Sequence, residues 1–138
     1  MKEVVLRGRT VNPGRAEGEA VVTKVPFSFL GELDPSTGVF SAVGHDLYGK
    51  SARGKVLVCP TGKGSSAGPT IAWLAKVAGN APKAMICVEV EPVIALAALT
   101  ANIPTIDKLD KNPIEVIKTG DYLIVDADHG LVRVKPKS

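Results

Sequence analysis

Two short apolar runs constrain the fold of this chain most strongly. "KVLVCP" (55–60) and "KAMICVEV" (83–90) each consist mainly of consecutive apolar residues and end at or near a proline. Such runs are typical of strands that are buried on both faces, as in parallel sheets covered by helices. Between them, apolar residues recur at the i, i+3, i+4 and i+7 spacing of a helix. The predicted buried stripe of this helix consists of Ile71, Leu74, Ala75 and Ala78.

Prolines and glycines set the limits of two predicted helices. Pro69 suits the first helical position, and Gly79 with the asparagine after it stops the helix. Pro92 opens a second helix, which ends before Pro104. Its predicted buried stripe consists of Ile94, Ala97, Ala98 and Ala101. "PTID" (104–107) then reads as a short third strand, so the order β-α-β-α-β predicts a parallel sheet with right-handed crossovers.

The two flanks of this core have a different pattern. They hold short β-rich pieces separated by glycine turns: "EVVLRGRTV", "GEAVVTKV", "DYLIVDAD" and "LVRVKP". Residues 128–130, Asp-His-Gly, predict a hairpin turn in which His129 has no functional role. Residues 31–53 form a long loop by comparison, and long structured loops in small domains tend to carry function.

Composition excludes several classes of protein. The 138 residues, 45% of them apolar, fit a single α/β domain over 1–138. The net charge of +3 is scattered and forms no basic stripe with interleaved aromatics, so we expect no nucleic-acid partner. No apolar stretch approaches the roughly 18–20 residues that span a bilayer, and the start does not read as a signal peptide. Cys59 and Cys87 are far apart in apolar runs, which indicates a reduced, cytoplasmic protein without metal-ligand spacing and makes Cys59 a small core residue.

The glycine-rich segment "PTGKGSSAGP" (60–69) lies between the first buried strand and the first helix, and three interpretations compete for it. In the first, its glycines permit a tight turn and Ser65 or Ser66 caps the helix. In the second, Gly62-x-Gly64-x-x-Ala67 matches a dinucleotide-binding pattern, with Glu89 at the end of the next strand as the ribose ligand. A Walker loop is excluded, because glycine rather than Ser or Thr follows the lysine at 63.

In the third interpretation the segment binds an anion and performs chemistry. Backbone amides at the helix start, the helix dipole and Lys63 hold the anion, while one serine acts as a base. Amides and cations near a serine oxygen help it to lose its proton. No histidine or aspartate lies beside the serines in sequence, so a catalytic triad has no local support.

Two further candidates lie outside this segment. His45 lies in the long loop, where it is either a solvated residue or part of the site. Glu89 and Glu91 follow a buried strand, at the edge where open α/β sheets place their ligands. Glu91 precedes Pro92, so it equally suits a carboxylate at a helix start.

The chain resembles the small subunit of the aconitase X family. The fragments that carry this resemblance cover nearly the whole sequence: "GRAEGEAVV" (14–22), "FSFLGELDPSTG" (27–38), "GHDLYGKSARGKVLVCPTGKGSSAG" (44–68), "EPVIALAALTANIPTID" (91–107) and "GDYLIVDADHG" (120–130). The resemblance implies a swivelling β/β/α domain like the mobile fourth domain of aconitases, which agrees with a parallel core flanked by short strands.

The resemblance also implies roles for residues of the glycine-rich segment. Ser65 takes the position of the catalytic base, and Ser66 that of a supporting hydrogen-bond donor; we expect Lys63 and Gly64 to bind substrate with them. Aconitases have a substrate-gripping arginine after the two serines, whereas this chain has Ala67. Other groups must therefore hold the anion: Lys63, Arg15 or a partner chain, with His45 and Glu89 as further candidates. Residues 87–88, Cys-Val, replace an expected Asn-Arg pair and put a substrate role for that segment in doubt.

The implied activity is that of a hydro-lyase subunit. In the family, water is removed from (R)-5-phosphomevalonate, a phosphorylated hydroxy acid, to give trans-anhydromevalonate 5-phosphate. This chain lacks the three cysteines of an iron–sulfur cluster, so we expect it to bind no cofactor and the cluster to belong to a large partner subunit. A hydroxyproline dehydratase subunit and a non-catalytic anion- or nucleotide-binding module remain the alternatives.

A partner subunit requires a docking surface near the glycine-rich segment. The large side chains closest to the 31–53 loop are Phe27, Phe29, Leu33 and Tyr48. We expect these four to anchor the partner in an exposed patch, because interfaces concentrate their binding energy in a few large buried side chains.

Overall fold

The sheet of this protein combines parallel and antiparallel strands. The computed structural model describes residues 3–137, and within that range eight strands occur in the order β1-β8-β7-β3-β4-β5-β6-β2. Their bounds are β1 Val4–Arg7, β2 Arg9–Asn12, β3 Arg15–Val22, β4 Val56–Cys59, β5 Ala84–Cys87, β6 Thr105–Asp107, β7 Tyr122–Asp126 and β8 Leu131–Lys135. Strands β3, β4, β5 and β6 pair in parallel, while β1, β8, β7 and β3 pair antiparallel, as does β2 with β6.

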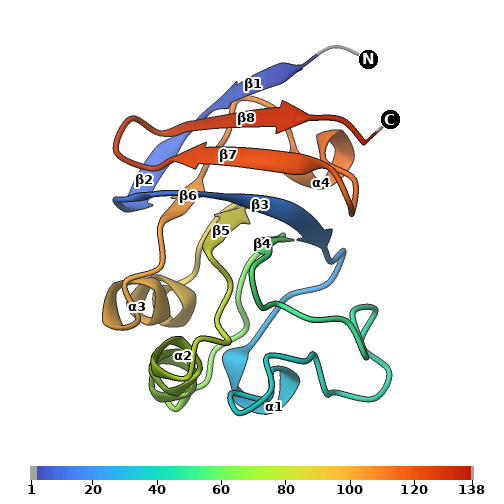
Figure 1. Cartoon of the computed structure of the whole chain (residues 1–138). Coiled ribbons are helices and arrows are strands. Elements are labelled where there is room, and N and C mark those ends of the chain that lie inside the picture. Colours follow the sequence, from blue (N-terminus) through green and yellow to red (C-terminus); the bar gives the residue numbers. More distant parts are fainter. Residues whose placement is uncertain (1–2, 138) are drawn as a thin grey trace.

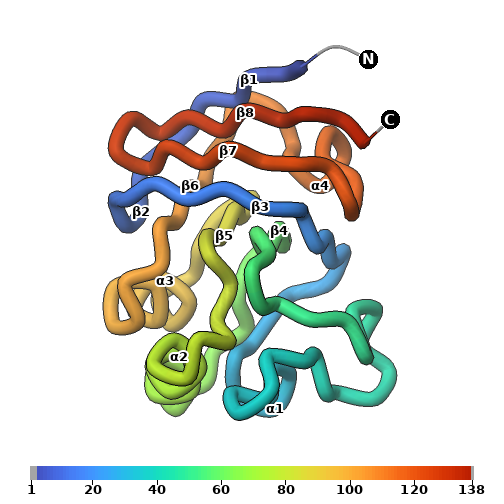
Figure 2. Tube along the Cα trace, viewed as in Figure 1, coloured from blue at the N-terminus to red at the C-terminus, as the bar shows by residue number. Residues whose placement is uncertain are grey.

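The sheet closes on itself through Gly8. Strands β1 and β2 lie at opposite ends of the sheet order, yet they are consecutive in the chain and separated only by this glycine. The Gly8 amide donates to the Gly130 carbonyl at 2.8 Å. A side chain at position 8 has no room, because its Cβ would lie 2.5 Å from the Asp107 carbonyl oxygen. The first and last strands consequently run side by side (Figure 2).

Four helical segments complete the described chain: α1 Phe29–Glu32, α2 Gly68–Val77, α3 Pro92–Thr100 and α4 Pro113–Val116. Helices α2 and α3 pack below the sheet, beside the segment that carries α1, with β1, β8, β7 and β3 above (Figure 1). One hydrophobic cluster fills the closed sheet and includes Leu6, Val58, Ile86 and Val132. A second cluster lies between the sheet, α2, α3 and the long loop. The predicted β-α-β-α-β core with flanking strands is therefore confirmed.

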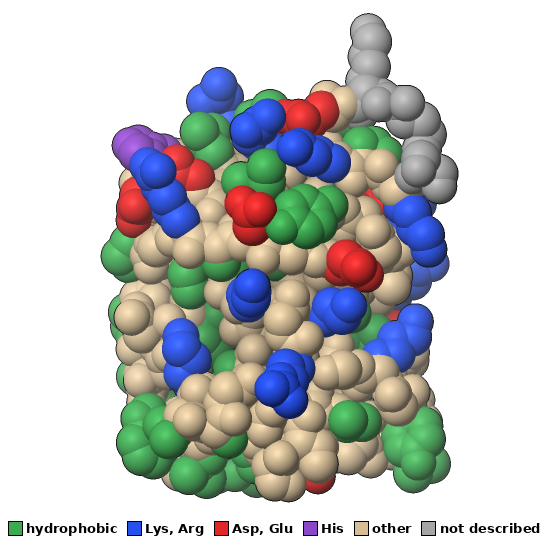
Figure 3. All heavy atoms as spheres, in the orientation of Figure 1, with side chains coloured by type: hydrophobic (Ala, Val, Ile, Leu, Met, Phe, Trp, Pro, Cys, Tyr) green, Lys and Arg blue, Asp and Glu red, His purple; other side chains and the backbone are tan. Residues whose placement is uncertain are grey.

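The buried face of α2 differs from the predicted stripe. Helix α2 buries Gly68, Pro69, Ala72 and Ala75, whereas Leu74 and Ala78 are exposed. Small residues on the inner face let α2 pack closely against α3, and the larger apolar side chains consequently lie outside. Trp73, Leu74 and Val77 of α2 are exposed. Hydrophobic side chains gather at the lower left of the face drawn in Figure 3. The predicted stripe of α3, by contrast, is buried in full.

The long loop is packed rather than open, which overturns most of the predicted docking anchors. Phe27, Phe29 and Leu33 are at most 2% exposed, and only Tyr48 is exposed as predicted. Phe27 is central to this packing, since its ring makes edge-to-face contacts with Phe29 and Phe40 at 5.0 and 5.8 Å between centroids. The aromatic residues near the glycine-rich segment therefore belong to the core of this chain, because few other large side chains are available to fill it.

His129 lies in the β7–β8 turn, as predicted. Among the described helices none is both long and apolar enough to cross a membrane.

Candidate functional site at the carboxyl edge of the parallel strands

The glycine-rich segment leaves β4 at its carboxyl end and enters α2, and the backbone of residues 27–28 braces it. The Phe27 amide donates to the Thr61 carbonyl at 3.0 Å, and the Lys63 amide donates to the Phe27 carbonyl at 3.1 Å. Gly62 lies beneath Glu91, where a Cβ would overlap the Glu91 carboxylate. We call residues 61–67 the glycine-serine turn. Its path is thus set by contacts on two sides.

The two serines do not cap α2, so the capping interpretation is wrong. The N-cap residue is Ala67, which makes no side-chain cap hydrogen bond. Neither the Ser65 nor the Ser66 hydroxyl has a hydrogen-bond partner among residues 3–137. Ser65 contacts the start of α2 only through its backbone carbonyl, which accepts from the Gly68 amide at 2.9 Å. Ser65 is half-buried and Ser66 is exposed. Both hydroxyls are therefore free to contact a ligand.

The backbone of the turn adds donors at the same place. The amides of residues 64–67 have no acceptor within the described part of the chain. They precede a helix of ten residues, whose dipole places partial positive charge at its N-terminus. Free amides at a helix N-terminus form a site for anions such as carboxylate or phosphate. This arrangement supports the anion-binding interpretation.

Glu91 caps the helix next to the turn. Its carboxylate accepts from the amides of Val93 at 3.0 Å and Ile94 at 2.5 Å, which makes it the N-cap of α3. The alternative role of Glu91 as a helix-start carboxylate is thereby confirmed. Both oxygens of Glu91 accept hydrogen bonds from α3, so this side chain is held in place beside Gly62.

Lys63 is paired with a carboxylate that sequence reasoning missed. The Lys63 ammonium lies 2.5 Å from Oε2 of Glu32, whose side chain is 10% exposed. The other oxygen of Glu32 accepts from the Ser28 amide at 2.8 Å and lies 3.6 Å from Nε2 of His45. His45 is thus brought to the turn as a buried neighbour of Glu32. The only sequence signal for Glu32 was a single acidic residue within the apolar fragment "FSFLGELDP".

Glu89 lies at the same edge, but in a separate hollow. This hollow has a volume of about 730 Å³ and is lined by Thr61, Glu89, Glu91 and Asn112 among others. Nearby, the fully buried Asp107 at the end of β6 accepts two hydrogen bonds from Arg9 and one from the Val90 amide. Asp107 is a second carboxylate that sequence reasoning missed, and its bonds brace the segment that carries Glu89.

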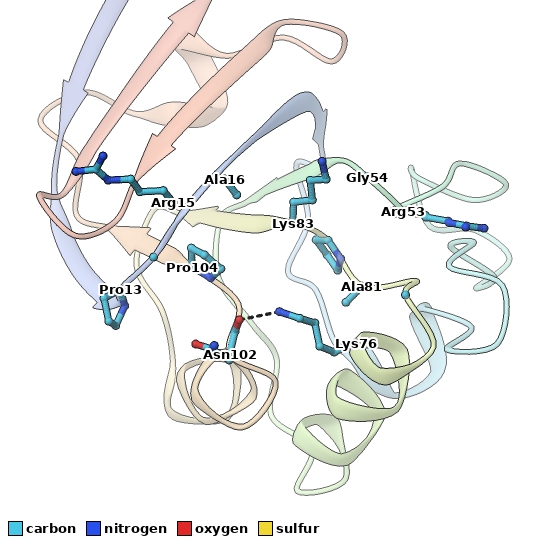
Figure 4. A pocket seen from close by; sticks show the side chains of 13 residues that line it. Pro13, Arg15, Ala16, Arg53, Gly54, Lys76, Ala81, Lys83, Asn102 and Pro104 are labelled. Atoms are coloured by element: carbon cyan, nitrogen blue, oxygen red, sulfur yellow. Dashed lines mark hydrogen bonds between the residues drawn. The ribbon is translucent and has the colours of Figure 1, made fainter.

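Arg15 lies at the opposite edge of the parallel strands. It begins β3, and its guanidinium is 3.5 Å from both Asp126 and Asp128. Figure 4 shows its side chain pointing away from the hollow at that edge, which lies near the start of β6 at Pro104. The structure therefore brings together the turn, His45 and Glu89 at one edge, and leaves Arg15 outside.

The cysteines of this chain do not form a cofactor site. Cys59 and Cys87 are fully buried side by side on β4 and β5, with 3.5 Å between their sulfurs. The hydrogen bond with Cys59 and burial raise the pKa of the Cys87 thiol well above its ordinary value, so this thiol stays protonated. Residues 3–137 contain no group of three histidine, cysteine or acidic side chains that could hold a metal ion. The described residues thus do not fit an iron–sulfur cluster.

Comparison with known families decides the relationship. The model of the aconitase X swivel domain matches residues 5–134. The chain belongs to this family. The chain is also similar to proteins named phosphomevalonate dehydratase small subunit: that of Methanosarcina acetivorans is 44% identical over 138 residues, covering 99% of this chain and 96% of the relative. That of Thermococcus onnurineus is 43% identical over 130 residues, covering 94% and 98%.

Solved structures confirm the swivel-domain fold of this aconitase X family member. Thermococcus kodakaraensis aconitase X in its holo-form superimposes with a TM-score of 0.90 at 41% identity, covering 96% of this chain and 99% of that one. 3-Isopropylmalate dehydratase from Methanocaldococcus jannaschii has a TM-score of 0.65 at 19% identity, covering 91% and 84%, and shares the fold. The name "small subunit" of the sequence relatives implies a larger partner subunit.

Proposed function

We propose that this chain is the small subunit of a hydro-lyase that dehydrates (R)-5-phosphomevalonate to trans-anhydromevalonate 5-phosphate, with Ser65 as the proton acceptor. The observation that carries this proposal is the state of the serines: two hydroxyls without a hydrogen-bond partner among residues 3–137 lie beside the free amides at the N-terminus of α2. The names of the 40–44% identical relatives support the choice of substrate.

The reaction breaks two bonds and forms a double bond. A proton leaves the carbon next to the carboxylate, its electron pair forms the carbon–carbon double bond, and the neighbouring tertiary hydroxyl departs as hydroxide. The abstracted proton and the hydroxide together make up the water that is lost. Hydroxide is a poor leaving group, and a Lewis acid held by the large subunit, an iron–sulfur cluster, would assist its departure. The part of the reaction that belongs to this chain is the removal of the proton.

The turn favours this step electrostatically. An ionised Ser65 hydroxyl is stabilised by the partial positive charge at the start of α2 and by the free amides of residues 64–67. Ser66, the backbone at Gly64 and the Lys63 ammonium provide further donors for a substrate anion. We assign His45 to Glu32 rather than to substrate, because its ring is 4% exposed and faces that carboxylate. Glu89 remains a candidate at the rim of the adjacent hollow.

The large subunit would close over the carboxyl edge of the parallel strands. The exposed hydrophobic side chains in or next to the long loop are Leu30, Val43 and Tyr48. Leu30 and Val43 therefore join Tyr48 as candidate contacts, in place of the predicted anchors that are buried. Closure would exclude water from the turn, which strengthens the electrostatic interactions around Ser65.

Coexpression with the large subunit tests the proposal. The purified complex should dehydrate phosphomevalonate, while this chain alone should fold and show no turnover, because it lacks the groups that assist hydroxide departure. A hydroxyproline should be tested beside phosphomevalonate as the competing substrate. Turnover by the isolated chain would contradict the two-subunit assignment, and a complex that acts only on the hydroxyproline would contradict the substrate assignment.

A further inference from the structure

A buried carboxylate braces the glycine-serine turn from the outside. Glu32 is 8% exposed as a residue, and three polar groups surround its two oxygens: the Lys63 ammonium, the Ser28 amide and the ring of His45. Through these contacts Glu32 connects residues 28–32 to Lys63 of the glycine-serine turn.

Stability alone gives a poor reason for this arrangement. Burying a carboxylate costs free energy, and a buried ion pair often contributes no more than a well-packed apolar pair. The neighbouring core is apolar and includes the buried aromatic residues Phe27, Phe29 and Phe40. The use of this charge therefore lies in the groups that the carboxylate contacts.

His45 lies beside one oxygen of this carboxylate. The Leu47 amide donates to Nδ1 of His45 at 3.1 Å, and Oδ1 of Asp46 lies 3.2 Å from the same nitrogen. Nε2 of His45 is buried, has no hydrogen-bond partner within residues 3–137, and points at Oε1 of Glu32 from 3.6 Å. The ring is held in place by parallel stacking on Phe40, with 6.5 Å between centroids. Oε1 accepts from the Ser28 amide and faces the His45 ring, which leaves Oε2 for Lys63.

We infer that Glu32 is the positioning residue of the site: it fixes the Lys63 ammonium and, through it, the glycine-serine turn. Lys63 is half exposed, so an unpaired ammonium at this position would sample many rotamers. The ion pair with Glu32 restricts the Lys63 side chain, which lies two positions before Ser65 in the sequence, and neutralises its charge. An anionic substrate then meets a fixed hydrogen-bond donor instead of a mobile cation. The catalytic consequence rests on the proposed function, whereas the link between Glu32 and Lys63 does not.

The structural arm of the test uses the chain alone. In ¹H–¹⁵N spectra of the full chain at low temperature, the Lys63 ammonium should give a signal slowed in exchange by its carboxylate partner. Glu32→Gln should abolish that signal. Glu19→Gln is the matched control, because Glu19 pairs with Lys55 at 3.4 Å in an exposed ion pair away from the turn. A Lys63 signal that persists in Glu32→Gln would overturn the inference.

The kinetic arm uses the assembled complex and a double-mutant cycle. Glu32→Gln and Lys63→Met should each lower kcat by about 10- to 100-fold with a smaller change in KM, as expected when a reacting group is misplaced. The double variant should be no worse than either single variant, because both changes remove one interaction. Additive losses, or a Glu32→Gln effect confined to thermal stability, would contradict a positioning role.

The two experiments distinguish a failure of the positioning inference from a failure of the proposed function. If Glu32→Gln does not fold, Lys63→Met tests the pair from its exposed side. If the wild-type complex shows no dehydratase activity, the proposed function fails, and the Lys63 signal alone decides whether Glu32 holds the turn.

Discussion

The two edges of the parallel strands both carry cations and a hollow, but only the carboxyl edge is arranged to hold an anion. At the amino edge, a hollow of about 570 Å³ is lined by Arg15, Arg53, Lys76 and Lys83. Figure 4 shows Arg15 and Arg53 pointing away from it, and Lys76 donates to the Asn102 carbonyl at 2.8 Å. The C-terminal ends of α2 and α3 lie there, with partial negative charge.

The carboxyl edge has fewer cations but a fixed arrangement. The N-terminus of α2, the free amides of the turn and a Lys63 side chain held by Glu32 meet within a few residues. The comparison teaches that neither the number of cations nor the size of a hollow identifies this site. Helix polarity and immobilised donors identify it, because an anion gains most from groups that need no reordering on binding.

The largest expected effect comes from the carboxyl edge. Ser65→Ala in the assembled complex should lower kcat by roughly 10²–10⁴-fold, the cost of losing a positioned proton-transfer group. Thermal unfolding should change little, because the Ser65 hydroxyl has no hydrogen bond among residues 3–137. Steady-state kinetics and calorimetry of the same preparation check both statements. Full turnover by the variant would remove Ser65 from the mechanism.

A pair of glycines in the turn tests how tightly this edge is built. Gly62→Ala should destabilise the fold by about 2–4 kcal/mol, because the new methyl group displaces the Glu91 cap and crowds Ile94. Gly64→Ala is the control: its Cβ would lie 3.8 Å from a methyl group of Val93, which is an ordinary contact distance. Denaturant unfolding should therefore separate two substitutions that look alike in sequence. Equal stabilities would show that Glu91 does not confine the turn.

Ser66→Ala should act on substrate binding and leave the fold intact. Since the hydroxyl is exposed and Ala67 occupies the N-cap, the free energy of unfolding should stay within about 0.5 kcal/mol of the parent. Loss of one hydrogen bond to a bound anion should raise KM by an amount equivalent to about 0.5–1.5 kcal/mol. A stability loss without a change in KM would restore the capping role that the structure contradicts.

The smallest effect is expected at the amino edge. Lys83→Ala should change neither kcat nor KM, and stability should shift by less than about 0.5 kcal/mol, because the side chain is exposed and makes no hydrogen bond within the described chain. A clear rise in KM would break the comparison, since it would make the amino edge part of substrate binding.

Much of the fold followed from local patterns in the sequence. The apolar runs of β4 and β5, the prolines that open α2 and α3, and the β-rich flanks were all read correctly. The position of the glycine-serine turn at the carboxyl edge followed from the same β-α order. The buried face of α2 did not, because both of its faces are apolar and periodicity cannot choose between them.

Contacts between residues that are distant in the sequence were decided only by the tertiary structure. Closure of the sheet at Gly8, the location of Arg15 at the opposite edge, and the Glu32–Lys63–His45 cluster carry no local signal. Burial and turns can be predicted from the local sequence, because they depend on side-chain polarity and backbone freedom at each position. An ion pair depends instead on which segments the fold brings together. The partner of Lys63 is Glu32 because the fold packs residues 27–32 against the glycine-serine turn.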